Sequence, residues 1–406
     1  MAGYPQYAPE YKIVIDGDRL PDAMRGSVIS VNYQDGIEGA DRVEVTLANP
    51  SLIFLDHPLF AVDSEFRLSI GYAPGPLEEV FAGSITGVEP TFPNGGMPTL
   101  RVVAQDALQG LQRGTKDRAF RISIPTIGNF PLPDPIVTSM VAALDGLIPL
   151  PDPVGGALST LMTLATFLSF PQFAQQNVRH QQNQSDFQFL TDIAQQNGWE
   201  MFIDHTMEPR GKILRFVFLI QSYTPELTLK WGSSLMDFTP RLTTVGDVFG
   251  VQARVWVDSL KMEFVIAVSW DYDRAAINLT IFPSLIGDVD DILGSDAKGK
   301  TVAVKPTGYA AAPFKILSEL LPRLNNRLTG SGNAVGNPKI KASRVVEFEG
   351  LGAQFSGLYR VTAATHTFDG GGYKTGFQAR KEVWFGSTPL PTNPRSVVRL
   401  QGAFSI

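Results

Sequence analysis

The sequence predicts a mainly β protein in which two similar β-barrels flank an inserted, helix-containing α+β region. Three observations lead to this fold class. Apolar and polar residues alternate in short runs that end at Gly, Pro, Asn or Asp, which is typical of antiparallel strands. One hairpin-like sequence occurs twice, starting near residues 81 and 355. Between the two copies lies sequence of a different kind, punctuated by proline and containing long apolar runs.

The composition makes several classes of function unexpected. Only 18% of the 406 residues are charged, the net charge is −6, and no run of five basic residues occurs, so we expect no specific nucleic-acid binding. The absence of cysteine removes disulfides, zinc–thiolate sites and thiol nucleophiles. No metalloprotease or nucleophile-elbow motif surrounds the four scattered histidines. We therefore expect no metal, no cofactor and no enzymatic activity.

The first barrel is predicted in residues 1–118. Six strand-like segments follow one another from Tyr11 to Gln105, each bounded by turn residues. They include DRVEVTLANP, which begins at Asp41, and the hairpin FAGSITGVEP, which begins at Phe81. The N-terminal sequence lacks the basic stretch and apolar run of a secretory signal, so we expect no export signal here.

Residues 119–210 are predicted to form the insertion, with two helices. The first lies in an uncharged stretch, Pro153–Val178, whose most apolar part spans 154–170. Serines and threonines recur there at about one helical turn, which favours a helix buried within the protein or against a partner over one that spans a membrane. Contact with a membrane or a packaged protein remains the alternative. The second helix, 185–198, has a capping box from Ser185 and Gln188 and a stop at Gly198.

The second barrel region is predicted in residues 211–385, and a C-terminal tail is predicted in 386–406. Strand-like segments resume after residue 211 and again near Lys339. Between them, residues 314–328 have the apolar spacing of a helix, with a kink expected at Pro322.

The repeated hairpin gives matching residues in the two halves of the chain. When two residues are added to the first arm, the matches include a phenylalanine, the glycine two positions later, a Thr-Phe pair and a Gly-Gly pair. Any two glycine-turn hairpins share some of these features, and that is the alternative to duplication of one barrel. We nominate as markers of the two barrels Phe81, Gly83, Phe355, Gly357, Gly371 and Gly372. Replacing them should damage folding before function.

A duplicated barrel has a consequence for symmetry. Three copies of a chain with two similar barrels present six of them in a ring, because cyclic oligomers close such sets. One side of the ring can then bind a sixfold partner and the other a threefold partner, which is the role of an adaptor.

These segments resemble the late-control D family, the central hub proteins of the baseplates of contractile phage tails and contractile injection systems. The resemblance rests on DRVEVTLANP with FAGSITGVEP, on QQNQSDFQFLTDIAQQNGWEMFID and on FEGLGAQFSGLYRVTAATHTFDGGGYKTGFQARK, in the family's order. It implies a homotrimer whose tail-tube-like barrels form a pseudo-hexameric ring. The partners it implies are a hexameric inner tube protein, a trimeric spike protein and a tape-measure protein.

The resemblance also implies assembly in the bacterial cytoplasm and a final place in the baseplate of a phage tail or injection particle. The second barrel is expected to end near residue 385, which leaves little chain for a fused spike, so the spike is expected to be a separate protein. The uncharged stretch 153–178 is not part of the family pattern.

One motif suggests a different function. Gly294, Gly299, Lys300 and Thr301 match the phosphate-loop pattern, so a nucleotide-binding assembly factor is one alternative. However, a phosphate loop precedes a helix, whereas the residues after Thr301 alternate like a strand and soon reach Pro306. We interpret the match as an exposed loop. A β-rich carbohydrate-binding adhesin is the second alternative.

Overall fold

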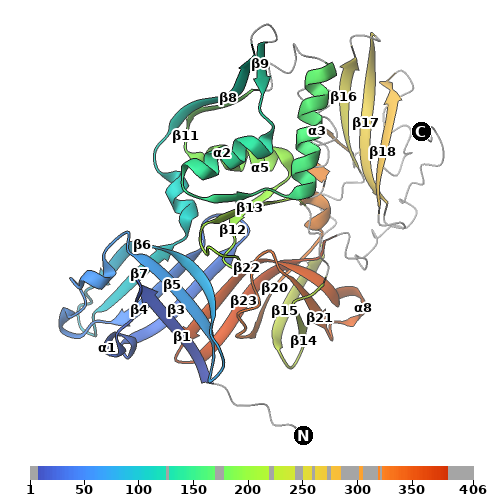
Figure 1. Ribbon diagram of the computed structural model, residues 1–406. Coiled ribbons are helices and arrows are strands. Elements are labelled where there is room, and N and C mark those ends of the chain that lie inside the picture. Colours follow the sequence, from blue (N-terminus) through green and yellow to red (C-terminus); the bar gives the residue numbers. More distant parts are fainter. Residues whose placement is uncertain are drawn as a thin grey trace.

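The computed structural model is mainly β, as predicted, and its elements fall into four groups (Figure 1). Two strand groups lie side by side at the bottom of the view, a group with three longer helices lies above them, and a four-stranded sheet stands beside those helices. The structure describes residues 8–124, 128–169, 178–218, 224–242, 250–257, 261–271, 276–284, 301–304, 319–320 and 322–382.

The first strand group is antiparallel throughout. Its strands are β1 (Ala8–Ile15), β2 (Asp18–Arg19), β3 (Val28–Gly36), β4 (Arg42–Ala48), β5 (Glu65–Ala73), β6 (Glu78–Thr91) and β7 (Thr99–Gln105), and the short helix α1 (Asp22–Arg25) comes after β2. Alternate residues of these strands point into one core, as the period of two predicts; in β4, Val43, Val45 and Leu47 are buried.

The second strand group continues the same sheet. It comprises β14 (Leu227–Lys230), β15 (Leu235–Leu242), β20 (Leu328–Val335), β21 (Val345–Glu349), the short helix α8 (Gly352–Phe355), β22 (Gly357–Asp369) and β23 (Gly372–Arg380). Its core is rich in aromatic rings, with Phe238, Phe348 and Tyr359 in mutual contact. Strand β22 pairs antiparallel with β3, so the described strands of both groups form one 13-stranded sheet.

The helical group lies between the two strand groups along the sequence. Its strands form two small sheets, β11 (Arg179–Gln184) with β8 (Lys116–Ile124) and β9 (Gly128–Pro131), and β10 (Ile148–Leu150) with β13 (Ile213–Val217) and β12 (Glu200–Ile203). Helices α2 (Asp134–Leu144) and α5 (Asp186–Asn197) share one core with these strands. Helix α3 (Pro153–Ser169) packs its first turn there, because Gly155 lies against Trp199 and Phe218.

Helix α5 begins and ends where the sequence indicates. Ser185 Oγ accepts a hydrogen bond from the Gln188 N–H at 3.2 Å, and Gln188 Oε1 accepts one from the Ser185 N–H at 3.2 Å. Gly198 is next after the helix with φ of 69°, a left-handed conformation that glycine adopts without strain. These signals are local, which is why they can be recognised from a few residues.

Helix α3 covers most of the uncharged stretch, and Leu161 and Leu164 are among its exposed side chains. The first turn of this helix is buried within the chain, and burial of these two leucines against a partner stays a prediction. Of the described helices, none is both long and apolar enough to cross a bilayer.

The helix predicted at 314–328 is described only in part. Residues 319–320 and 322–325 are helical, whereas residues 314–318 and residue 321 lie outside the described residues. Contrary to the prediction, Leu328 does not belong to this helix but opens β20, where it pairs with Leu242. The helix therefore ends earlier than its apolar spacing suggests, because Leu328 pairs with another strand instead.

The strand pairings give groups that differ from the predicted segments at several boundaries. Strand β8 begins at Lys116 but pairs within the helical group, and β13, beyond residue 210, pairs with β12. The four-stranded sheet is separate from the second strand group and contains β16 (Gly250–Val257), β17 (Met262–Asp271), β18 (Ala276–Pro283) and β19 (Thr301–Val304). Residues 386–406 lie outside the described residues.

The two similar hairpins are present as β6–β7 and β22–β23, and both carry a β-bulge in the first arm. The unpaired residue is Thr86 in β6 and Thr362 in β22. The distance along the chain between these threonines equals that between Gly95 and Gly371, the turn residues matched in the sequence. Bulges are specific local features, so their correspondence extends the match from sequence to backbone.

The nominated markers occupy different places within these hairpins. Phe81 is fully buried in β6, whereas Phe355 is the last residue of α8, so these two phenylalanines are not equivalent. Gly83 lies inside β6 and Gly357 opens β22. Gly371 lies in the second turn, and Gly372, with φ of 102°, opens β23. Gly83 and Gly357 are 274 residues apart and the bulged threonines are 276 apart, so the two-residue addition in the sequence match falls inside β22, between Gly357 and Thr362.

Candidate functional site

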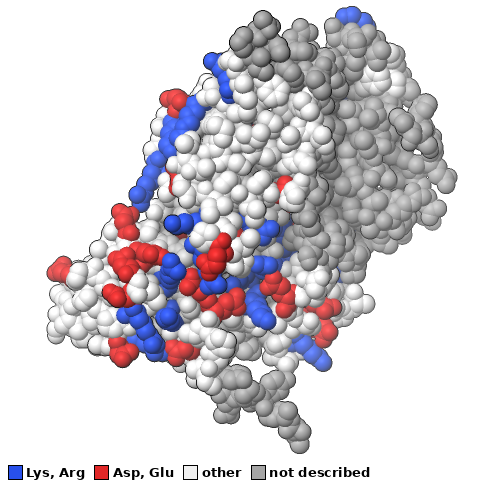
Figure 2. All heavy atoms as spheres, viewed as in Figure 1, with Lys and Arg blue, Asp and Glu red and all other residues white. Residues whose placement is uncertain are grey.

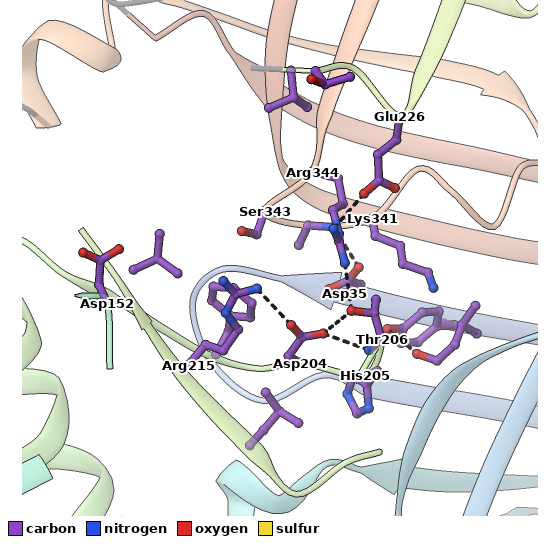
Figure 3. A pocket seen from close by; sticks show the side chains of 18 of the residues that line it. Asp35, Asp152, Asp204, His205, Thr206, Arg215, Glu226, Lys341, Ser343 and Arg344 are labelled. Carbon is purple, nitrogen blue, oxygen red and sulfur yellow. Dashed lines mark hydrogen bonds and ion pairs between the residues drawn. The ribbon is translucent and has the colours of Figure 1, made fainter. Parts of the chain in front are cut away.

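The three larger groups meet at a joint that contains an acidic cluster, and we name it the carboxyl cluster: Asp35, Asp41, Asp106, His205 and Lys341. Asp35 is on β3, Asp41 lies in the turn between β3 and β4, and Asp106 comes directly after β7. His205 lies just beyond β12 of the helical group, and Lys341 precedes β21 of the second strand group. Figure 3 shows Asp35, His205 and Lys341 at this joint, each on a segment of a different group.

Asp41 and Asp106 are each held by hydrogen bonds from backbone N–H groups. Asp41 Oδ1 accepts from the Gly36 N–H at 3.0 Å, and Asp106 Oδ1 accepts from the Leu108 N–H at 3.0 Å, which caps the short helix 107–112. The Asp41 N–H donates to Asp106 Oδ2 at 3.1 Å. An aspartate at the end of a strand is a common turn signal, so no sequence pattern separates these two from ordinary turn residues.

His205 joins the helical group to the first strand group. Its Nδ1 accepts a hydrogen bond from the Ala82 N–H at 3.3 Å, and its Nε2 lies 3.2 Å from Asp41 Oδ2 and 3.9 Å from Asp106 Oδ2. Asp41, Asp106 and His205 are at most 5% exposed. As one of four dispersed histidines, His205 has no surrounding pattern that points to this position.

Burial shifts the protonation equilibria of the cluster. It raises the pKa of Asp106 strongly, and the neighbouring Asp41 carboxylate raises it further. Burial likewise raises the pKa of Asp41. The same loss of hydration lowers the pKa of His205, in spite of the opposing charges of Asp106 and Asp35. Protonated carboxyls and a neutral imidazole are therefore favoured at this joint.

The donor atoms of Asp41, Asp106 and His205 lie within 4.8 Å of one another, which is close enough to consider a metal ion. The hydrogen bond at His205 argues against it. Because Nδ1 accepts from Ala82, a neutral imidazole carries its hydrogen on Nε2, the atom that would have to bind the metal. The arrangement fits proton sharing between carboxyls and imidazole better than coordination.

A polar cavity of about 330 Å³ opens beside the cluster (Figure 3). Its charged side chains pair with one another: Arg215 with Asp204 at 3.0 Å, and Arg344 with Glu226 at 2.7 Å. Lys341 bridges to Glu78 at 2.6 Å. The first two pairs each lie within one group, whereas the pair of Lys341 and Glu78 joins the second strand group to the first.

A second joint holds the helical group to the second strand group, and we name it the arginine clamp: Glu200, Arg360, Arg380 and Glu382. Arg360 lies 2.7 Å from Glu200 and 3.2 Å from Glu382, and Arg380 lies 2.6 Å from Glu200 and 2.8 Å from Glu382. Burial opposes ionisation of Glu200, but the two arginines outweigh it and hold the pKa of Glu200 below its ordinary value. Two cations and two anions therefore neutralise one another inside the joint.

His366, in the repeated hairpin, is a buried structural residue. Its Nε2 lies 3.0 Å from the Ile340 carbonyl, and its Nδ1 lies 2.9 Å from the Tyr373 hydroxyl. Burial lowers the pKa of His366 to about 3, so the ring is neutral. It stacks on Tyr33 across the β22–β3 pairing, which ties the two strand groups together.

The phosphate-loop match lacks the element that should come after it. Gly294, Gly299 and Lys300 lie outside the described residues, but Thr301 opens β19, which pairs in parallel with β16. A strand at this point leaves no helix N-terminus to receive phosphate, and the motif requires one.

Comparisons with known proteins give structural matches only. Neither the protein-family models nor the curated proteins yield a match. Among solved structures, the 43 kDa tail protein of prophage MuSo2 from Shewanella oneidensis aligns with 93% of this chain and 99% of its own, at 11% identity and a TM-score of 0.59. A tail protein from Neisseria meningitidis MC58 aligns with 94% of this chain and 100% of its own, at 10% identity and a TM-score of 0.59.

A third structure comes from a secretion system. The E. coli c3393 protein, a component of the type VI secretion system with structural similarity to the T4 tail proteins gp27 and gp5, aligns with 93% of this chain and 79% of its own. The identity is 11% and the TM-score 0.53. At such identities the likeness concerns the fold. The chain therefore has the fold of phage tail proteins and of their counterparts in type VI secretion.

Proposed function

We propose that this chain is the central hub of the baseplate of a contractile tail or injection particle. Three copies form a ring of six β-barrels that binds the sixfold inner tube on one side and a separate threefold spike on the other, with a tape-measure protein as a further partner. Its role is structural and not enzymatic. It is assembled in the bacterial cytoplasm and ends in the baseplate. The observation that carries the proposal is the fold, shared over almost the whole chain with phage tail proteins.

The internal repeat supports the symmetry of this proposal. Two hairpins with bulges at Thr86 and Thr362 lie in the two strand groups, one in each half of the chain. A chain that contains two similar barrels, at 1–118 and within 211–385, supplies two quasi-equivalent units per copy. Three copies then match a hexameric tube without any change of the tube's own symmetry.

The rigidity of the joints supports a role in transmitting force. The strand groups are fused through β22 and β3, and the helical group is fixed to both by the carboxyl cluster and the arginine clamp. A hub that passes the force of sheath contraction to a spike requires such bracing, because loosely linked groups would absorb the movement.

The surface offers contact area for neighbouring subunits. Helix α2 exposes Ile136, Met140 and Leu144, one residue per turn, while it buries Val137 and Val141 on its other side. Figure 2 shows that charged side chains gather over the strand groups and that much of the face above them carries none. Apolar, weakly charged surface of this kind is typical of interfaces.

The adhesin alternative receives no support from the exposed aromatic residues. Phe92, Trp231 and Trp256 are each more than half exposed, but they belong to three different groups. A sugar-binding surface would need such rings on one face.

The oligomeric state tests the proposal. Multi-angle light scattering of the purified full chain should give three times the chain mass of 44.2 kDa, and a complex formed with the spike protein should contain three copies of this chain. A chain that stays monomeric under both conditions would contradict the hub.

A further inference from the structure

The carboxyl cluster holds more acid than base. Asp41 and Asp106 are fully enclosed and Asp35 lies beside them at the cavity wall. The one lysine of the cluster, Lys341, is itself buried and donates to Glu78. His205 is held neutral by its hydrogen bond from Ala82. With all carboxyls ionised, the joint would enclose an excess of negative charge, which a low-dielectric interior does not tolerate.

The cluster is also placed where its charge affects an interface. His205 belongs to the helical group, whereas Asp41 and Asp106 belong to the first strand group. The His205 ring lies 5.3 Å from the buried Phe81 ring of β6. The contact between these groups therefore depends on short distances between His205 Nε2 and the two carboxyls.

We propose that the carboxyl cluster is a proton-dependent latch, which holds the helical group on the first strand group while its carboxyls carry protons and loosens that joint when they ionise. This inference is independent of the proposed function, because it rests on the joint within one chain. The groups that face the cluster come from every element around it: Tyr33 and Asp35 of β3, Glu78 of β6, Asp41, Asp106, Asp204, His205 and Lys341.

The protons fix the direction of the pH dependence. The closed joint raises the pKa of Asp41 and Asp106, so it binds protons that the opened, hydrated joint releases. The stability gained from these protons is complete in acid and is lost as the pH rises through the raised pKa values. His205 opposes this only in acid, because its lowered pKa removes stability when the pH falls below the ordinary value for histidine.

Hydrogen exchange measured by mass spectrometry on the full chain tests the latch. From about pH 6 to about pH 8.5, peptides covering 36–42, 104–108 and 200–206 should lose protection after correction for the intrinsic rate. Over the pH range in which the closed joint holds one proton more than the open joint, protection should fall about tenfold per pH unit. A peptide covering 375–382, at the arginine clamp, should not lose protection, because Glu200 stays ionised and because Lys381, whose pKa burial lowers to about 8, becomes neutral in its buried position as the pH rises.

The variant Asp106→Asn distinguishes the latch from a general loss of protection at alkaline pH. Asparagine retains the cap on Leu108 but cannot ionise, so the pH dependence of protection at the joint should become shallower. Equal pH dependence in the wild type at both joints would overturn the proposal, and so would an unchanged slope in a folded Asp106→Asn. Equimolar zinc retained by the purified protein after dialysis would also overturn it, since the cluster would then be a metal site.

Discussion

At the scale of single residues, the two joints neutralise charge in different ways. In the arginine clamp, Arg360 and Arg380 share the carboxylates of Glu200 and Glu382, and every charge has an opposite partner. In the carboxyl cluster, bound protons neutralise the carboxylates, as the arginines do in the clamp. The clamp therefore keeps its strength over a wide pH range, whereas the cluster responds to pH.

Removing one member of the clamp should be costly. Glu200→Ala leaves two nearly buried guanidinium groups short of a partner, and we expect the free energy of unfolding to fall by about 3–5 kcal/mol. Urea denaturation of the full chain measures this loss. The matched control is Glu89→Ala, which removes an ion pair with Arg101 whose side chains are about half exposed, and it should cost under about 1 kcal/mol. Similar losses in both variants would mean that the clamp does not hold the groups together.

At the scale of elements, the bulged hairpin β6–β7 depends on close approach of its backbone. A Cβ atom added to Gly83 would overlap the Gln105 carbonyl oxygen of β7, whereas one added to Gly87, further along the same strand, meets nothing within 4 Å. Gly83 therefore has a structural reason to be glycine that Gly87 lacks.

This contrast gives a matched pair of variants. Gly83→Ala should destabilise the chain by about 3 kcal/mol, because backbone atoms must move to accept the new methyl group. Gly87→Ala should stay within about 0.5 kcal/mol of the wild type. Thermal unfolding followed by circular dichroism compares the two. A Gly83→Ala protein as stable as Gly87→Ala would show that the β6–β7 contact is looser than the structure indicates.

Elements with local signals could be predicted from the sequence, and elements made by distant pairings could not. Ser185, Gln188 and Gly198 mark α5 because each acts on its own neighbours. The pairing of His366 with Tyr33 joins strands at opposite ends of the chain, and no short pattern encodes it. Likewise, Asp41 and Asp106 resemble ordinary turn residues until folding brings His205 between them.

At the scale of the whole molecule, the fold joins two similar strand groups into one continuous sheet and fixes a helical group above them at two joints. Its likeness to phage tail proteins extends over more than nine tenths of the chain. The described pairings link β3 to β22 instead of closing the first strand group on itself. This pairing joins the two strand groups in one continuous sheet, in agreement with the proposed ring.

The proposed role as a hub depends on the symmetry of the assembled ring. Electron cryomicroscopy of the purified assembly, viewed along its axis and reconstructed without imposed symmetry, tests it most directly. We predict three chains around a threefold axis, with β1–β7 and the second strand group of each chain alternating at six similar positions. A ring with any other number of chains, or one in which the two strand groups lie at unrelated radii, would contradict the hub.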